Sequence, residues 1–320
     1  MPSLRCLEKV AVTGATGFIG GHLVRRLVSG GCRPTLLGRH ENYGRLLRGL
    51  EGHVQWTTCD LLDGESVRAA IRKEAPNTLF HLAGTRSRGE AADCAILNFY
   101  GTAQLLEESQ KNGVRRIVMA GSAEEYGTQP GPLNERFSLK PSTGYGISKA
   151  LATKHALALS ARKSCPVVVI RPFSVYGPGQ PANMFVAQAV DAAVREIPFK
   201  MSSGEQKRDL VFVEDVVRGL ISAAMAPRIE GRVINLGTGR PRRLRDVAER
   251  IWEMSATSAP LVVGALKPGP DELCDTWADI REAAELLDWR AKVDLDEGLR
   301  QTISFARVQY GDKVQLCQTA

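Results

Sequence analysis

The stretch KVAVTGATGFIG, residues 9–20, has the pattern of a short apolar strand, a glycine-rich turn and the first residues of a helix. Glycine is needed where a chain turns sharply, where backbone meets a pyrophosphate and where a helix packs closely on a strand. The first N–H groups of a helix are unpaired and can bind phosphate oxygens. The stretch therefore predicts a dinucleotide site formed by Gly14, Thr16, Gly17, Phe18, Ile19 and Gly20.

Further apolar runs and helical patterns alternate along the first 180 residues. Strand candidates follow at 34–39, 54–61, 78–84, 116–122 and 167–172. Between the first two runs, Ile19, Leu23 and Leu27 recur at four-residue spacing, which places them on one helix face. Strands that are apolar throughout and separated by helices indicate a parallel sheet covered on both faces. We predict an α/β fold with a doubly wound, Rossmann-type parallel sheet.

The alternation changes after residues 176–179, YGPG. Helical patterns follow at about 182–195 and 213–226, then a strand at 232–237 and a mainly helical tail. We predict a dinucleotide-binding domain over 1–177, to which 210–240 returns. A smaller, interleaved, mainly helical substrate-binding domain would comprise 178–209 and 241–320.

The net charge and the distribution of arginines indicate which kind of molecule the chain binds. The net charge of +7 could suggest nucleic acid, but the arginines are dispersed and the densest cluster, 240–245, is short and lacks aromatic residues. We expect no nucleic acid partner and regard that cluster as a solvated face. A modest positive field still favours an anionic small molecule such as a nucleotide diphosphate.

The cell compartment can also be predicted. No apolar run approaches the roughly 20 residues that a membrane helix needs, and the first residues lead straight toward a strand rather than an export signal. The 7 cysteines are scattered singly, without a C-x-x-C pair, which predicts reduced thiols and no metal site. We expect a cytoplasmic protein with no membrane partner.

Arg39, at the end of the 34–39 run, bears on the choice of cofactor. NAD enzymes usually place an acidic side chain here to hold the ribose 2′-hydroxyl, and a carboxylate would repel a 2′-phosphate. An arginine fork can bind that phosphate. Arg39 therefore predicts NADP, with NAD still possible if the side chain only points into solvent.

The spacing of the glycines and one further motif resemble those of the short-chain dehydrogenase/reductase superfamily. These are the G-x-x-G-x-x-G spacing at 14–20 and YGISK at 145–149. The chain length, RPFSVYGPG at 171–179 and KRD at 207–209 are similar to the extended branch, the NAD-dependent epimerase/dehydratase family. The resemblance covers essentially the whole chain. It implies a catalytic trio of Ser122, Tyr145 and Lys149, with Lys149 also holding the nicotinamide ribose.

Tyr145 and Lys149 are four residues apart on a predicted helix and so share a face. An ammonium about 4 Å from a phenolate, at an effective dielectric constant of about 20, contributes up to about 4 kcal/mol. That would lower a phenol pKa by roughly three units, from about 10 toward neutrality. Tyr145 could then exchange a proton with a sugar hydroxyl or carbonyl.

The resemblance implies roles for other residues as well. Ser122 would hydrogen-bond the reacting oxygen, and Asn98 would order the backbone near the active site. The remaining cofactor contacts would come from Asp60, Leu61, Leu82, Ala83, Gly84, Pro172 and Val175. The substrate contacts would come from Ser174, which stands where the family has asparagine, and from Asn183 and Arg208. A surface salt bridge with Asp209 is the alternative role for Arg208.

The resemblance leaves several reactions open. We expect an NADPH-dependent reductase that converts a nucleotide-linked 4-keto-6-deoxyhexose to the alcohol, because residues 121–127, GSAEEYG, look like those of such reductases. A nucleotide-sugar 4-epimerase is the first alternative. A 4,6-dehydratase ranks third, since Glu124 could serve as its base but Ala123 stands where the acid would be. A non-catalytic NADP-binding sensor is a distant fourth. Family members often form homodimers through the helices that carry Asn98 and Tyr145, and we expect a homodimer here.

Overall fold

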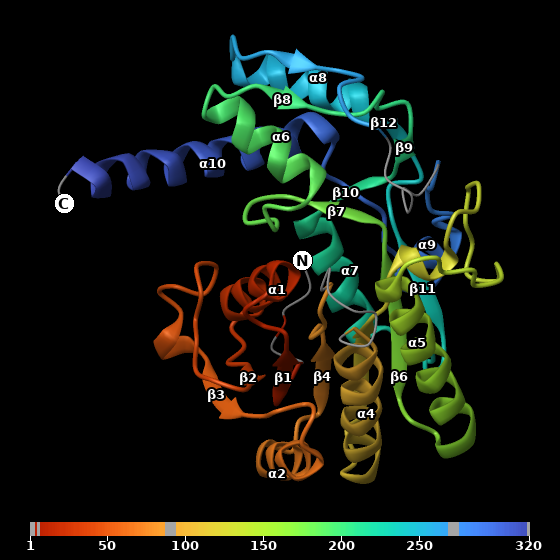
Figure 1. The fold of residues 1–320 in the computed structure, drawn as a ribbon. Helices are drawn as coiled ribbons and strands as arrows, with labels where there is room; N and C mark the ends of the chain where they lie inside the picture. Colours follow the sequence, from red (N-terminus) through yellow and green to blue (C-terminus); the bar gives the residue numbers. More distant parts are fainter. Residues whose placement is uncertain (1–3, 5–6, 87–93, 268–274, 319–320) are drawn as a thin grey trace.

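A seven-stranded parallel sheet forms the centre of the computed structural model, which describes residues 4, 7–86, 94–267 and 275–318 (Figure 1). The strand order is β11-β6-β5-β4-β1-β2-β3. The strands are β1 (Val10–Thr13), β2 (Thr35–Gly38), β3 (Gln55–Thr58), β4 (Thr78–His81), β5 (Arg116–Ala120), β6 (Val167–Pro172) and β11 (Val233–Leu236). The predicted doubly wound α/β fold is confirmed, and the predicted strand at 232–237 does rejoin the sheet as β11.

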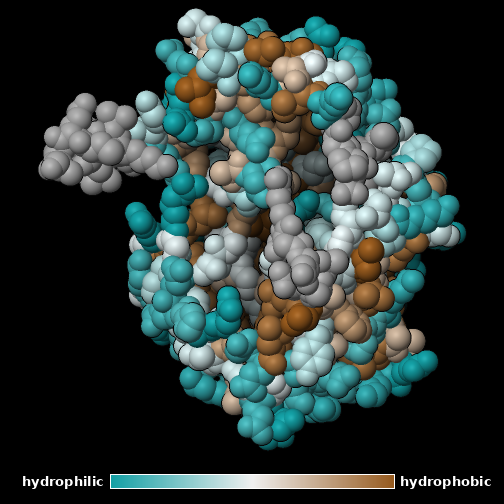
Figure 2. Space-filling model, in the orientation of Figure 1, coloured by the Kyte–Doolittle hydropathy of each residue, from teal (hydrophilic) through white to brown (hydrophobic). Residues whose placement is uncertain are grey.

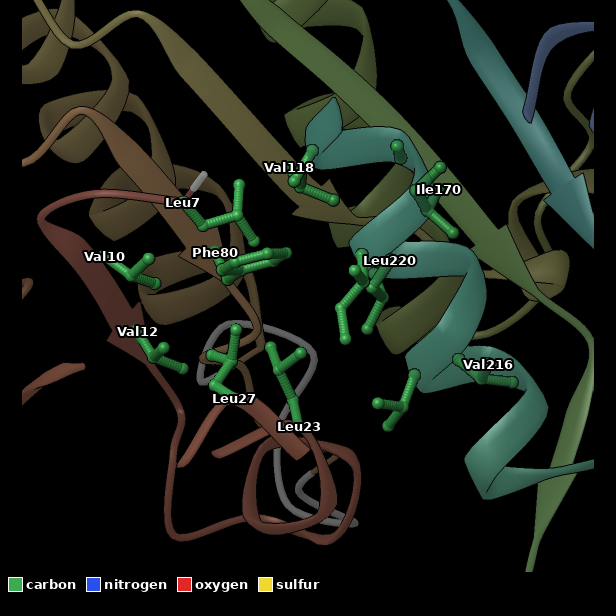
Figure 3. Close-up of a cluster of buried hydrophobic side chains, with 14 of the residues drawn as sticks. Leu7, Val10, Val12, Leu23, Leu27, Phe80, Val118, Ile170, Val216 and Leu220 are labelled. Atoms are coloured by element: carbon green, nitrogen blue, oxygen red, sulfur yellow. The ribbon is translucent and has the colours of Figure 1, made fainter. Parts of the chain in front are cut away.

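Helices cover both faces because the side chains of each strand alternate between them. The side chains of Val10 and Val12 lie on one face of the sheet, where α1 (Phe18–Ser29) and α7 (Val213–Met225) pack. The side chain of Ala11 lies on the opposite face, which is covered by α2 (Gly64–Glu74), α4 (Thr102–Lys111) and α5 (Gly144–Lys163). Figure 3 shows the first core, where Leu23 and Leu27 of α1 and Leu220 of α7 converge on Phe80 of β4.

A smaller set of elements lies above the sheet in Figure 1. Its helices are α6 (Phe185–Val194), α8 (Leu244–Ser255) and α10 (Leu295–Gln318). They share one apolar core, which includes Val190, Ile251 and Leu299. The C-terminal part of α10 projects away from the rest of the molecule (Figure 1). In contrast, α9 (Arg281–Leu287) packs against β11 and α7 of the larger part.

Short strand pairs lie outside the seven-stranded sheet. β7 (Ser174–Tyr176) pairs with β10 (Leu210–Phe212), and β9 (Lys207–Arg208) pairs with β12 (Arg242–Arg243). β8 (Phe199–Lys200) pairs with β13 (Leu261–Val262). The surface is hollowed between the two parts (Figure 2). Among the described residues, no helix combines the length and the apolar character needed to cross a membrane.

The strand order fixes where a ligand should bind. From β1 the chain continues to β2 and β3 on one side, and then crosses to β4, β5 and β6 on the other. The carboxyl ends of β1 and β4 therefore flank the point at which the strand order reverses. In open α/β sheets ligands bind at such a point.

Candidate active site

The turn after β1 has the geometry that a pyrophosphate needs. Gly14 has φ +70°, and a Cβ there would lie 2.5 Å from the backbone nitrogen of Ala83. A Cβ on Gly20 would lie 2.1 Å from the Gly14 carbonyl oxygen, so a side chain there would push α1 away from the turn. No described side chain caps Gly17 at the start of α1, and the first turn of that helix carries no acidic residue. The helix N–H groups are therefore available to a phosphate.

The predicted cofactor residues stand at neighbouring positions along the carboxyl edge of the sheet. In strand order they are Asp60 and Leu61 after β3, Arg39 after β2, Gly14, Thr16 and Gly17 after β1, Leu82, Ala83 and Gly84 after β4, and Pro172 at the end of β6, with Val175 in β7. Phe18, Ile19 and Gly20 begin α1. Arg39 is exposed, as a residue that contacts a 2′-phosphate must be. This row of positions fits a dinucleotide laid across the edge, with its phosphates over the glycine turn.

The trio that the sequence predicts is brought together at the β5 end of this row. Ser122 follows β5, while Tyr145 and Lys149 lie in the first turns of α5. Lys149 Nζ is buried and donates a hydrogen bond to the Ala120 carbonyl oxygen, at 2.6 Å. A Cβ on Gly84 would lie 3.6 Å from the same Nζ, which places the ammonium beside the end of β4.

The predicted effect of Lys149 on Tyr145 is wrong for this structure. Burial raises the pKa of Tyr145 to about 12, and the cation that lowers it most is Arg86. The Glu124 carboxylate raises the pKa further, and a hydrogen bond with Ser122 lowers it. Burial also lowers the pKa of Lys149 to about 8. The sequence argument counted the attraction between two charges and left out their desolvation, which is the larger effect at a buried site.

Arg86 and its partners are the part of the site that the sequence did not predict. The Arg86 guanidinium carbon lies 4.5 Å from the centre of the Tyr145 ring. Its Nη2 forms an ion pair with Glu124 Oε1, and Thr143 Oγ1 donates to Glu124 Oε2 at 3.0 Å. A basic residue two positions beyond Gly84, where the chain leaves β4 beside the cofactor edge, was the available signal.

Asn98 holds two sides of the site together. It is fully buried in a π-helical turn, Ile96–Gly101, that precedes α4. Its side-chain amide donates to the Thr85 carbonyl oxygen and to Ser148 Oγ, both at 2.9 Å, and its Oδ1 accepts from Thr85 N at 2.8 Å. Ser148 Oγ in turn donates to the Tyr145 carbonyl oxygen at 2.8 Å. The loop after β4 and the start of α5 are thus both hydrogen-bonded to the side chain of Asn98.

His81 extends this network beneath the cofactor edge. Its Nε2 lies 2.8 Å from Thr102 Oγ1, which itself donates to the Asn98 carbonyl oxygen at 2.7 Å. Since the Thr102 hydroxyl hydrogen is already used, His81 donates from Nε2. In the neutral imidazole, Nδ1 then accepts from Thr13 Oγ1, which lies 2.7 Å away, so a neutral ring satisfies both contacts.

The folded protein should resist protonation of His81. Burial, with a smaller contribution from Lys149, lowers the pKa of His81 from 6.5 to about 3. The unfolded chain takes up this proton below about pH 6.5, so the stability conferred by neutral His81 is complete above that pH. It is lost toward pH 3, at about 1.36 kcal/mol per pH unit. Between pH 7.5 and 5 the loss should be about 2 kcal/mol, and His81→Gln should lack this component. Urea unfolding at both pH values measures it, and equal losses in the two proteins would contradict the assignment.

A buried ion pair holds the backbone of Ser122 in place. Glu125 and Arg171 are both almost fully buried, and Arg171 Nη2 lies 2.7 Å from Glu125 Oε2. The other carboxylate oxygen, Oε1, accepts from the Ser122 backbone N–H at 2.8 Å. Arg171 Nη1 donates to the Tyr126 hydroxyl at 3.0 Å, and that hydroxyl donates to Asn235 Oδ1 at 2.8 Å. The ends of β5, β6 and β11 are therefore linked through polar side chains.

The predicted substrate residues lie outside the seven-stranded sheet, in short strands and a turn. Ser174 is in β7, Asn183 is exposed in the turn before α6, and Arg208 is in β9. The register of β9 and β12 places Arg208 opposite Arg242. The alternative role of Arg208, a surface salt bridge with Asp209, is wrong. Asp209 is fully buried and accepts hydrogen bonds from Thr238, Gly239 and Ala278.

Comparison with known proteins agrees with this geometry. A sequence model of the "NAD dependent epimerase/dehydratase family" matches residues 10–237. A Bacillus subtilis protein named "Uncharacterized UDP-glucose epimerase YtcB" is 27% identical over 315 residues, which cover 94% of this chain and 99% of that protein. The Thermotoga maritima UDP-glucose 4-epimerase, solved with UDP-glucose, has a TM-score of 0.87 at 27% identity, over 94% of this chain and 99% of its own. MoeE5, solved with UDP-glucose and NAD, has a TM-score of 0.83 at 30% identity over the same shares. MoeE5 has also been solved with UDP-glucuronic acid and NAD.

Proposed function

The chain belongs to the NAD dependent epimerase/dehydratase family, and from this premise we propose that it inverts C4 of a UDP-linked hexose or hexuronate. The observation that carries the proposal is the meeting of Ser122 and Tyr145 beside the glycine turn, in a fold shared with UDP-sugar epimerases. This was the first alternative to the reductase expected from the sequence, and the relatives support it better than that reductase.

Each residue of the trio has a defined task in this reaction. The Tyr145 phenolate, which the Arg86 charge and the Ser122 hydrogen bond favour, takes the proton of the C4 hydroxyl as the sugar is oxidised and returns it when the ketone is reduced. Ser122 hydrogen-bonds the same oxygen and keeps C4 in place. Lys149 holds the ribose of the pyridine nucleotide, whose chemistry supplies a reversible hydride acceptor. The configuration inverts when the 4-ketone presents its opposite face before reduction.

The smaller part of the molecule would bind the nucleotide diphosphate of the substrate. We assign this role to residues 178–209 and 241–320, apart from α9, which packs on the larger part, and apart from residues 268–274 and 319–320, which lie outside the described chain. Arg208 and Arg242 stand opposite each other in the β9–β12 pair, where two guanidinium groups suit a diphosphate. Ser174 and Asn183 are the uncharged contacts proposed on the same side.

Incubation with a set of nucleotide sugars tests the function. The purified protein is mixed with UDP-glucose, UDP-galactose, UDP-N-acetylglucosamine or UDP-glucuronic acid, and the products are separated by chromatography. We expect one pair of C4 epimers to interconvert, from either direction, without net change in nicotinamide absorbance. Decarboxylation or elimination products would assign a different member of the family, and binding without turnover would favour the sensor.

Arg39 favours a second candidate, the NADPH-dependent 4-ketoreductase. A side chain that binds the 2′-phosphate suits a cofactor drawn from the reduced NADPH pool, whereas an epimerase recycles the cofactor it holds. A 4-keto-6-deoxyhexose substrate supplied with NADPH separates the two, since only a reductase consumes the cofactor.

Arg39→Ala should weaken NADP binding about 10- to 100-fold and leave NAD binding nearly unchanged, because one charged hydrogen bond contributes about 1.5–3 kcal/mol. Titration of tryptophan fluorescence with each nucleotide measures both affinities. Arg33→Ala is the matched control, an exposed arginine at the opposite end of β2. Equal affinity of the Arg39 variant and the wild type for NADP would show that Arg39 does not select the cofactor.

We propose a homodimer that buries the exposed apolar side chains of the π-helical turn and α5. Ile96, Tyr100, Ile147 and Leu151 are each 43–53% exposed. Figure 2 shows hydrophobic residues over the area where α4 and α5 lie in Figure 1. Light scattering should give twice the chain mass of 34.8 kDa, and a monomer at micromolar concentration would contradict the assignment.

A further inference from the structure

Glu124 precedes Glu125 in the loop after β5, and both of its carboxylate oxygens have a partner. Arg86 reaches one oxygen from the end of β4, and the Thr143 hydroxyl reaches the other from the start of α5. The Glu124 side chain is 16% exposed, whereas that of Arg86 is 48% exposed. Neither residue belongs to the trio, yet the Arg86 guanidinium lies over the Tyr145 ring.

A carboxylate without these partners could catalyse a side reaction of the proposed 4-ketone intermediate. Once C4 is a ketone, the hydrogen on C5 becomes acidic because the electron pair left behind is delocalised onto the ketone oxygen. The C5–H bond can break with its proton moving to Glu124 and its electron pair forming the C4–C5 enolate. Return of the proton restores the ketone, whereas the enolate electron pair can instead expel the C6 hydroxyl as water, which is elimination across C5–C6. C4 epimerisation requires that this step does not compete with reduction.

We propose that Arg86 is a specificity-determining residue that, together with Thr143, engages Glu124 and keeps it from acting as a base toward C5. The inference rests on the proposed function, because it needs a substrate ketone at C4. Arg86 lies in the segment that follows β4, Glu124 in the turn that follows β5, and Thr143 immediately before α5, so three separate segments fix the carboxylate. Glu124 also raises the pKa of Tyr145, which places its charge close to the phenol that faces C4.

Charge and geometry both favour this role. A charge-assisted hydrogen bond is about twice as strong as a neutral one and restricts the direction of the accepting lone pairs. Loss of Arg86 would release one oxygen of Glu124 and leave only the neutral Thr143 contact. The side chain could then turn toward a sugar held against Tyr145. Because Arg86 is half-exposed, its removal should leave the fold intact.

Exchange of the C5 hydrogen with solvent deuterium tests the inference. The epimer pair found for the wild type is incubated in D₂O, and C5 deuterium is measured by NMR as a fraction of C4 turnover. We expect little exchange in the wild type, an increase of at least about 10-fold in Arg86→Ala, and its loss in Arg86→Ala/Glu124→Gln. Arg68→Ala, which removes a similarly exposed arginine and its ion pair with Glu108 between α2 and α4, is the matched control and should behave as the wild type.

A second substrate keeps the test decisive if Arg86→Ala fails to epimerise. UDP-4-keto-6-deoxyglucose already carries the ketone, so C5 exchange above the enzyme-free rate needs no oxidation step. Arg86→Ala exchange equal to wild type on both substrates would overturn the inference, as would exchange that persists in the double variant. A wild type that leaves every nucleotide sugar unchanged would instead overturn the proposed function, and the inference with it.

Discussion

Tyr145→Phe should lower kcat for C4 epimerisation by about 10²- to 10⁴-fold, the range that a positioned acid–base group contributes. The substitution removes only the hydroxyl and leaves the ring beneath Arg86. KM should change little, because the nucleotide diphosphate is bound elsewhere. Initial rates at saturating substrate measure the effect.

Tyr310→Phe is the matched control, since this tyrosine lies on the projecting part of α10 and is 43% exposed. It should retain wild-type kcat. If Tyr145→Phe also kept kcat within about threefold, another group would have to move the proton and the assigned role of the trio would be wrong.

Glu125→Ala should lower the free energy of unfolding by about 3–5 kcal/mol, because it leaves the Arg171 charge buried without its partner. It also removes the acceptor of the Ser122 backbone N–H, so the catalytic hydroxyl should lose its fixed position. We therefore expect kcat to fall as well. Urea unfolding and initial rates measure the two effects separately.

Two further variants test whether the unpaired charge of Arg171 causes the loss of stability. Glu249→Ala removes an ion pair whose side chains are half-exposed, and it should cost less than about 1 kcal/mol. Glu125→Ala/Arg171→Met should recover part of the stability, since it removes the unpaired charge. A Glu125→Ala variant as stable as Glu249→Ala would show that the buried pair does not hold the ends of β5 and β6 together.

Much of the fold could be predicted because each main strand is a local apolar run. The run at 167–172, for example, became β6 with the same bounds, and the run at 78–84 became β4, which ends three residues earlier. The two- and three-residue strands of the smaller part were not predicted. β9 and β12 exist because Lys207 and Arg208 pair with residues more than thirty positions away, and no local pattern marks such a contact.

The site was predictable only where a residue's position in a strand or helix determines its neighbours. Ser122, Tyr145 and Lys149 meet because strand ends and helix starts share one edge of the sheet. Arg86 was missed because its contacts with Glu124 and Tyr145 depend on loop conformation. His81 was missed although a polar residue ends the otherwise mostly apolar run TLFH, which could have indicated its hydrogen bonds.

The reaction was harder to predict than the site. Reduction, epimerisation and dehydration share the first hydride step and the same trio, so their difference lies in what happens to the 4-ketone. Local motifs such as GSAEEYG favoured reduction, while similarity along the whole chain favours epimerisation. The NADP preference inferred from Arg39 stays a prediction, since MoeE5 was solved with NAD.

The fate of the C4 hydrogen tests the central claim most directly. UDP-glucose carrying deuterium at C4, or the corresponding label in the epimer pair that the enzyme accepts, is converted and the product examined by NMR and mass spectrometry. Transient oxidation at C4 predicts that the deuterium is retained at C4 of the inverted sugar, with no dependence on added NADPH. Loss of the label to water or to a free nicotinamide, or inversion at another carbon, would contradict the account.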